Sequence, residues 1–151
     1  RRQRQMCKET VPGNIREIGY KSFSGCSGLR EISIPSTVKT VGIGAFENCT
    51  ELKDISLPTT LTEINYYTFS GCTSLTTLTL HSKLTAINNY AFAGCKSLTE
   101  IHCKNSNPPL IGENTFRDVN RIGCKIFVPS KRAKKSYSTA LYWNEFTIYI
   151  E

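Results

Sequence analysis

Seven cysteines are the side chains of this 151-residue sequence with the widest choice of chemistry. Four of them recur at a constant spacing of 23 residues, at Cys26, Cys49, Cys72 and Cys95. Cysteines can pair as disulfides, ligate a metal or act as nucleophiles, depending on what lies beside them. The sequence contains neither a C-x-x-C pair nor a histidine at a spacing typical of zinc sites. We therefore expect no metal site.

Few other residues could perform catalysis. The two histidines are His81 and His102, and the two aspartates are Asp54 and Asp118. None lies in a nucleophile-elbow motif, a zinc-protease motif or a glycine-rich phosphate loop. We expect no catalytic residue, no cofactor and no enzymatic activity.

The period of 23 residues involves many apolar positions besides the cysteines. A phenylalanine precedes each of the four cysteines by three residues, at Phe23, Phe46, Phe69 and Phe92. Leucine follows each cysteine by three residues, and further aliphatic residues keep the same register. Such a period is typical of a solenoid, in which each unit buries its apolar face against its neighbours. We expect these phenylalanines and cysteines to form a structural ladder through the core.

Stacking of equivalent coils directs the four periodic cysteines the same way, which does not suit disulfide pairing. We expect them to be buried free thiols that act as small apolar fillers. Cys7, Cys103 and Cys124 lie outside this ladder. A disulfide among these three cysteines remains an alternative.

Each unit predicts one short strand and two special backbone positions. The spacing L-x-x-I-x-I from Leu29 to Ile34 ends in a period-2 alternation, which predicts strands that pair in parallel from coil to coil at about 4.8 Å. A short helical turn should carry each phenylalanine. Only glycine or asparagine occupies one column, which predicts a left-handed backbone there; its members are Gly19, Gly42, Asn65, Asn88 and Gly112. The second predicted position, with C-cap character, comprises Gly25, Asn48, Gly71, Gly94 and Asp118.

The C-terminal segment differs from the repeats. Ser130 is a good N-cap, and Ala133, Tyr137, Ala140 and Leu141 fall on one face of a predicted helix. Trp143 and Phe146 should fold onto the last coil, and residues 147–150 alternate like a closing strand. We divide the chain into a basic N-terminal extension (1–10), a solenoid (11–116) and a C-terminal capping unit (117–151).

The unit from Val41 to Pro58 resembles the BspA-like subclass of leucine-rich repeats, whose pattern I-G-x-x-A-F-x-G-C-x-S-L-x-x-I-x-I-P it follows. The resemblance covers about residues 11–116. It implies an α/β solenoid coiled right-handedly, with short parallel strands on one face. Residues 107–116 and 126–129 resemble the terminal unit of such proteins from host-associated bacteria. This second resemblance implies an exported, extracellular or surface-attached protein that contacts host matrix, host cells or other bacteria. No signal segment precedes the repeats, so we expect it to have been removed or to lie outside this sequence.

The strand face is the candidate binding surface, because solenoids often bind partners along such a face. Its predicted outward residues are Arg30, Glu31, Ser33, Lys53, Asp54, Ser56, Thr77, Thr79, Glu100 and His102. We expect a protein partner. The alternatives are a structural spacer without a ligand, a glycan-binding module, and a strand face that is merely solvated. The strand columns disfavour glycans because they contain no exposed aromatic platform.

The formal charge of +7 does not by itself identify a partner. The excess charge lies at the two ends, while residues 9–116 are nearly neutral. The basic segment 117–135 lacks the aromatic platforms of nucleic-acid readers, so we expect no nucleic acid partner. No apolar run is long enough to cross a membrane, and we expect a monomer.

Overall fold

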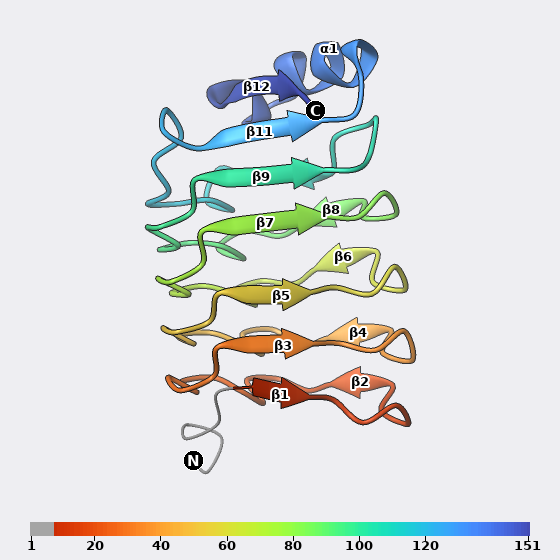
Figure 1. Ribbon diagram of the computed structural model, residues 1–151, viewed down its shortest axis with the longest axis vertical. Coiled ribbons are helices and arrows are strands. Elements are labelled where there is room, and N and C mark those ends of the chain that lie inside the picture. The colour runs from red at the N-terminus through yellow and green to blue at the C-terminus, as the bar shows by residue number, and fades with distance from the viewer. Residues whose placement is uncertain (1–7) are drawn as a thin grey trace.

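The computed structural model describes residues 8–151, so Cys7 and the alternative disulfide that includes it lie outside the described part. The chain winds into a stack of coils with short strands (Figure 1). In chain order the elements are β1 (Lys8–Thr10), β2 (Glu17–Ile18), β3 (Glu31–Ser33), β4 (Thr40–Val41), β5 (Asp54–Ser56), β6 (Glu63–Ile64), β7 (Thr77–Leu80), β8 (Ala86–Ile87), β9 (Glu100–Cys103), β10 (Leu110–Ile111), β11 (Lys125–Val128), α1 (Lys131–Thr139), a 3-10 helix (Trp143–Glu145) and β12 (Thr147–Ile150).

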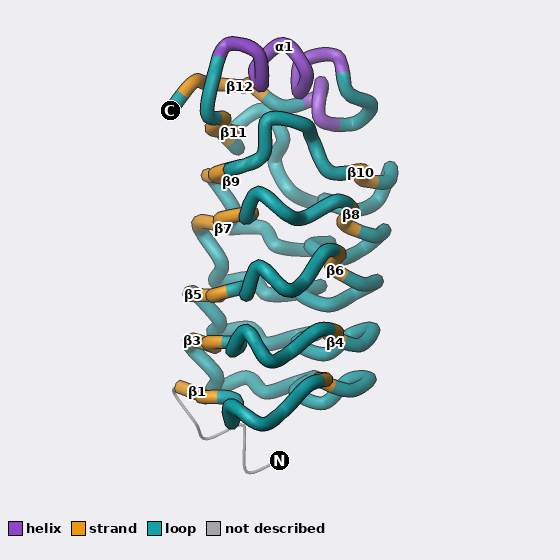
Figure 2. Tube along the Cα trace, turned by 90° about the vertical axis from the view of Figure 1, so that its right-hand side faces the viewer, coloured by secondary structure: helices purple, strands orange, loops and turns teal. Residues whose placement is uncertain are grey.

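The strands line two opposite sides of the stack (Figure 2). β1, β3, β5, β7, β9, β11 and β12 form one side, and β2, β4, β6, β8 and β10 form the other. All pairing is parallel, and the register of β3 on β5, Glu31 opposite Asp54, equals one period of 23 residues. The predicted solenoid of parallel strands is therefore confirmed. Pairing begins at β1, whereas the sequence predicts repeats from residue 11.

Stacked rings fill the third side of each coil. Phe23, Phe46, Phe69, Phe92 and Phe116 form one continuous stack, with neighbouring ring centroids 5.2 to 5.5 Å apart. All except Phe23 are almost completely buried. Burying a large apolar side chain stabilises a fold by roughly 1.5–3 kcal/mol. Each coil buries its phenylalanine against those of the adjacent coils, so neighbouring coils stabilise one another.

Both sheets are interrupted between the same two coils, residues 39–61 and 62–84. One sheet ends at β5 and another begins at β7, and on the opposite side the sheets end at β4 and begin at β6. The phenylalanine turns still join these coils, because Gly44 N–H donates to Tyr66 O at 3.0 Å and Phe46 N–H to Thr68 O at 2.9 Å. We call this junction between the two coils the seam.

One of the two predicted left-handed columns is wrong. The column of Gly42 does not have positive φ; the left-handed residues lie two positions later, at Lys21, Gly44, Tyr67 and Tyr90. Gly42 is small for another reason: a Cβ there would lie 2.7 Å from Tyr20 N. The second column is confirmed, with φ between 58 and 77° at Gly25, Asn48, Gly71, Gly94 and Asp118. These reversals divide each phenylalanine segment into successive hydrogen-bonded turns at the place where the sequence predicts a short helical turn.

The C-terminal segment covers the last coil, where Figure 1 places α1 and β12 at one end of the stack. Ser130 caps α1 as predicted, since its Oγ accepts from Ala133 N at 3.1 Å. Trp143 is buried and its Nε1 donates to Pro109 O at 2.7 Å. The closing strand is confirmed, because β12 pairs with β11. The prediction for Leu141 is wrong: the backbone leaves the helix at Ala140, and Leu141 is exposed.

Candidate binding surface

The strand face consists of the outward side chains of β3, β5, β7 and β9 and of the residues that directly precede them. Side chains alternate across a strand, so one set faces solvent while the other enters the core. Parallel register places Ser33 beside Ser56, and Thr79 beside His102. The exposed members are Arg30, Ser33, Lys53, Asp54, Ser56, Thr77 and Thr79, and the half-buried members are Glu31, Glu100 and His102.

A shallow groove of about 310 Å³ lies on this face at the seam. Its walls carry two carboxylates, Glu31 and Asp54, and four hydroxyl residues: Ser33, Ser56, Thr77 and Thr79. Its floor includes Ile55, which is only half-buried where its neighbours in the same column are buried. The missing pairing between β5 and β7 thus opens the sheet surface where six predicted face residues meet.

The charged residues at and beside the groove differ in whether they form an ion pair. Arg30 Nε lies 3.3 Å from Glu51 Oε1, and both side chains are about half exposed. Such a solvent-exposed pair contributes roughly 0–1 kcal/mol. Lys53 and Asp54 have no ion pair among the part of the chain that the structure describes. A partner could therefore form ion pairs with Arg30, Lys53 or Asp54 at little cost in free energy, because no strong ion pair has to be broken first.

His102 lies on the strand face but is covered by the C-terminal unit. Its Nε2 is 3.1 Å from Glu100 Oε2, and its Nδ1 hydrogen-bonds to Glu151. Its ring also stacks on Phe127, with centroids 4.8 Å apart. Only 21% of its side chain remains exposed. The structure therefore does not bring His102 to solvent in the way it does Thr79.

The strand face continues onto two strands that the sequence assigned only to capping. Phe127 of β11 stacks between His102 and Tyr149 of β12, whose ring centroid lies 5.7 Å from that of Phe127. Tyr149 is 41% exposed, and Lys125 Nζ lies 5.8 Å from its ring centroid. In the sequence, the alternation of residues along 125–128 and 147–150 is the pattern that indicates outward-facing rings at Phe127 and Tyr149. The predicted strand columns, which end at His102, contain no exposed aromatic, and these rings extend the face beyond them.

The cysteine ladder is buried and free of disulfides. The Sγ of Cys49 donates to Phe23 O at 3.2 Å, and that of Cys95 donates to Phe69 O at 3.2 Å. Burial raises the pKa of both thiols to about 12 and raises that of Cys72 well above its usual value. Because the thiolate is the nucleophile, these thiols are poor nucleophiles at neutral pH. Cys103 and Cys124 are also buried and free.

The basic residues of α1 lie on its solvent side. Ala133 and Tyr137 are buried, while Lys131, Arg132, Lys134 and Lys135 are exposed. Across residues 8–151, no group of three or more histidine, cysteine or acidic side chains could hold a metal ion. Over the same residues, no helix combines the length and apolar character needed to cross a membrane.

Comparison with solved structures identifies bacterial leucine-rich repeat proteins. A leucine rich cell surface protein from Faecalibacterium prausnitzii superposes with a TM-score of 0.77 and 27% identity, over 95% of this chain and 35% of that one. A leucine-rich repeat protein from T. pallidum gives a TM-score of 0.72 and 29% identity, over 82% and 59%. The pneumococcal vaccine antigen PcpA shares the fold at 22% identity, with a TM-score of 0.68 over 97% and 42%. This chain spans about a third to three fifths of the length of these proteins.

Sequence comparison identifies the same family. No curated protein matches the chain significantly. Residues 3–133, by contrast, match six copies of the BspA type leucine rich repeat region. This match covers most of the sequence, and the observed parallel-strand coils are those that the repeat predicts. The chain belongs to the BspA-type leucine-rich repeat family.

Proposed function

We propose that this solenoid is a secreted or surface module that binds a protein of the host matrix, a host cell or another bacterium through its strand face. One observation carries the proposal: the groove at the seam, where six predicted face residues of three neighbouring strands lie together, all of them exposed except the half-buried Glu31. A rigid array lowers the entropy cost of binding, because its contact groups are already ordered.

Several features support a non-enzymatic binding role. Leucine-rich repeat proteins of this family are generally repeat modules without catalytic function. The raised pKa values of Cys49 and Cys95 argue against a cysteine nucleophile. The groove at the seam is open and lined by short polar side chains, which suits contact with a protein surface.

The printed names of two structural relatives support an exported location. One is described as a cell surface protein and another as a vaccine antigen. We expect an antibody raised against this chain to label intact cells of the source organism. Signal that appears only after the cells are permeabilised would contradict the proposed location.

Binding can be tested by pull-down from an extract of host extracellular matrix, with an unrelated solenoid as bait control. Proteins captured only by this chain would then be purified and measured individually by surface plasmon resonance. The test variant combines Asp54→Lys and Ser56→Arg, both on the exposed side of β5. The matched control combines Glu63→Lys on β6 and Thr40→Arg on β4, which make the same charge change on the opposite side of the stack.

We expect the β5 variant to lose affinity by about tenfold or more, since it reverses a charge in the contact region, and the control to change little. Equal binding by the β5 variant and the parent chain would place the site elsewhere. A failure to enrich any matrix protein would favour the second candidate function, a structural spacer.

A further inference from the structure

The solvent side of α1 carries a group of closely spaced positive charges. Its members are Lys131, Arg132, Lys134 and Lys135, and all of them are exposed. Residues three or four positions apart are neighbours on a helix surface, so Lys131 lies beside Lys134 and Lys135, and Arg132 lies beside Lys135. The four cations therefore form one continuous patch, which rises only about 6 Å along the helix axis. We call it the α1 patch.

No acidic side chain balances the α1 patch within residues 8–151. The helix itself contains no acidic residue, and none of the four cations takes part in an ion pair of the described chain. Two acidic residues of the C-terminal unit, Glu145 and Glu151, pair instead with Arg121 and Lys104. The positive charge of the patch is thus available to an external anion.

This arrangement of charges is unfavourable for the helix alone. Like charges three or four residues apart repel each other and destabilise a helix. Lys131 and Arg132 also lie in the first turn, where the helix dipole favours acidic side chains. Proteins break such local rules mainly at functional sites. An anion beside the patch would relieve both unfavourable effects.

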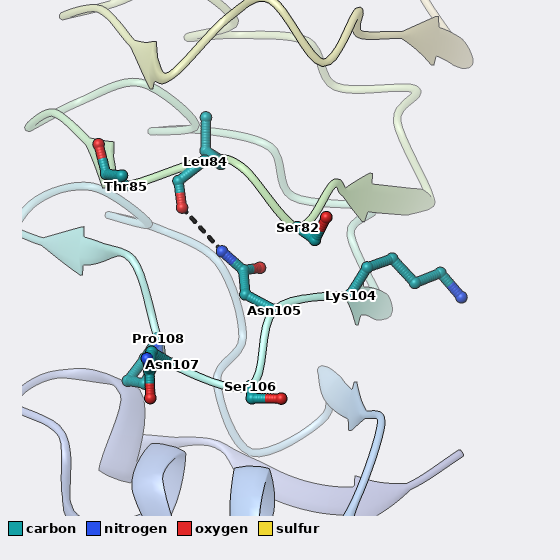
Figure 3. A pocket seen from close by; sticks show the side chains of 8 residues that line it. All are labelled: Ser82, Leu84, Thr85, Lys104, Asn105, Ser106, Asn107 and Pro108. Atoms are coloured by element: carbon teal, nitrogen blue, oxygen red, sulfur yellow. Dashed lines mark hydrogen bonds between the residues drawn. The ribbon is translucent and has the colours of Figure 1, made fainter.

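α1 is anchored firmly at the C-terminal end of the stack (Figure 2). Its residues Ala133 and Tyr137 are fully buried, and Tyr137 Oη donates to Asn105 O at 3.3 Å. Asn105 Nδ2 in turn donates to Leu84 O of the preceding coil at 2.7 Å (Figure 3). The helix therefore holds its four cations on an ordered backbone, which lowers the entropy cost of binding.

The composition of α1 favours a sulfated polysaccharide over other polyanions. A helix that inserts into a membrane surface needs an exposed apolar side, whereas the apolar side of α1 is buried in the cap. Proteins that hold single-stranded nucleic acids stack the bases on aromatic rings, and the one aromatic residue of α1 is the buried Tyr137. A sulfated polysaccharide needs neither feature, because its charged groups lie along a hydrated chain.

We propose that the α1 patch binds a sulfated polysaccharide. The three lysines pair with its sulfate groups as point charges, and the planar guanidinium of Arg132 donates two hydrogen bonds to one sulfate, as it does to phosphate. Such binding depends on charge and needs no aromatic platform. The patch is separate from the strand face, so it stands or falls independently of the proposed protein binding.

The test measures binding of a fluorescently labelled heparin hexasaccharide to the whole chain by fluorescence anisotropy. The test variant replaces the patch by glutamine, which preserves helix propensity: Lys131→Gln, Arg132→Gln, Lys134→Gln and Lys135→Gln. The matched control removes the same charge from exposed positions of the repeats: Arg16→Gln, Lys39→Gln, Lys83→Gln and Lys96→Gln. A third variant keeps the charge of the patch: Lys131→Arg, Lys134→Arg and Lys135→Arg. Circular dichroism verifies the fold of each variant.

We expect the affinity of the parent chain to fall roughly 20- to 100-fold between about 50 and 200 mM salt, as for about three to four paired charges. The test variant should lose affinity by about tenfold or more, whereas the control and the arginine variant should stay within about threefold of the parent.

Four results would overturn the proposal. The first is that the hexasaccharide does not bind at about 50 mM salt. The second is an equal loss of affinity in the two glutamine variants, which would show that net charge alone determines binding. The third is that a desulfated hexasaccharide binds as tightly as the sulfated one. The fourth is that a DNA duplex or phosphatidylserine vesicles bind more tightly through the same four residues, which would assign the patch to another class of polyanion.

Discussion

Gly42 packs against the backbone of the coil that precedes it. A Cβ at this position would lie 2.7 Å from Tyr20 N and 2.8 Å from Gly19 C, neither of which can move aside as a flexible side chain can. Gly19 occupies the same column one coil earlier, but a Cβ there would meet only Ser22 Oγ, at 3.3 Å. The same residue type in the same repeat position therefore has two different reasons to be present.

This contrast predicts unequal effects of two identical substitutions. Gly42→Ala should lower the free energy of unfolding by about 1–3 kcal/mol, the usual cost of overpacking. Gly19→Ala should change it by less than about 0.5 kcal/mol, as an ordinary surface substitution does. Urea unfolding followed by circular dichroism measures both. Equal effects of the two substitutions would show that contact with the backbone of the preceding coil is not the reason for glycine at this position of the repeat.

The buried thiols predict a loss of stability in alkali. Burial raises the pKa of Cys95 and Cys103 from 9.0 to about 12, so the unfolded chain releases these protons at a lower pH than the folded chain does. The stabilising contribution is complete below about pH 9 and is lost as the pH rises toward 12, at up to roughly 1 kcal/mol per pH unit for each thiol. The free energy of unfolding should therefore fall steeply between pH 9 and pH 11.

The single variant Cys95→Ala tests the cause. It should be less stable than the parent at pH 8 because it leaves a small cavity, yet its stability should fall less steeply above pH 9. Val38→Ala truncates a buried side chain without an ionisable group and should keep the parental slope. A Cys95→Ala slope equal to the parental one would rule out thiol ionisation as a contributor.

At the scale of the strands, the pairing breaks where Asn65 replaces the glycine of its column. Gly42 N–H donates to Ile18 O at 2.7 Å, and Asn88 N–H donates to Ile64 O at 2.9 Å. At the seam, the side-chain Nδ2 of Asn65 reaches Val41 O at 3.5 Å instead. A side-chain contact thus stands at the seam where the other coils have a backbone bond. Asparagine at this position does not by itself break the pairing, because Asn88 keeps its backbone bond to Ile64.

The seam predicts local differences in hydrogen exchange. The backbone N–H groups of Thr62 and Thr76 have no partner among the described residues, whereas their equivalents one coil later, Thr85 and Thr99, donate to the preceding coil at 2.8 and 2.9 Å. Exchange at Thr62 and Thr76 should be about tenfold faster or more, because their exchange does not require breaking a hydrogen bond. Residue-resolved NMR measures these four amides in one experiment. Equal protection would mean that the sheets are continuous in solution.

The period in the sequence is sufficient to predict the strands and their outward residues. A column such as Ser33, Ser56 and Thr79 can be read directly, because alternation fixes which side chains leave the core. The seam cannot be read in this way, since the period of the sequence continues unchanged across it while the strand pairing stops. The period does not predict the outward rings of Phe127 and Tyr149, because no repeat defines the register of the C-terminal unit on β9.

At the scale of the whole molecule, the stack has a covered C-terminal end and, among the described coils, one weak junction. The C-terminal end is covered by Trp143, which contacts Phe116, Tyr137 and Phe146. In a solenoid each coil interacts only with its neighbours, so stability is a sum of local terms. The seam lowers one of these terms, because the strand pairing that joins the other coils is missing there. The phenylalanine turns, side-chain bonds such as that from Ser74 Oγ to Thr50 O, and the apolar core still cross it.

This arrangement predicts that a destabilising substitution affects the coils on its own side of the seam more than the coils on the other side. Trp143→Ala removes a buried ring and an indole hydrogen bond, at a cost of about 3–5 kcal/mol. Native-state hydrogen exchange should then accelerate in β9 and β11 far more than in β3. Val38→Ala, on the other side of the seam, should accelerate exchange in β3 more than in β9 and β11. Uniform acceleration of all strands by either variant would show that the stack unfolds as one cooperative unit, with the seam as strong as any other junction.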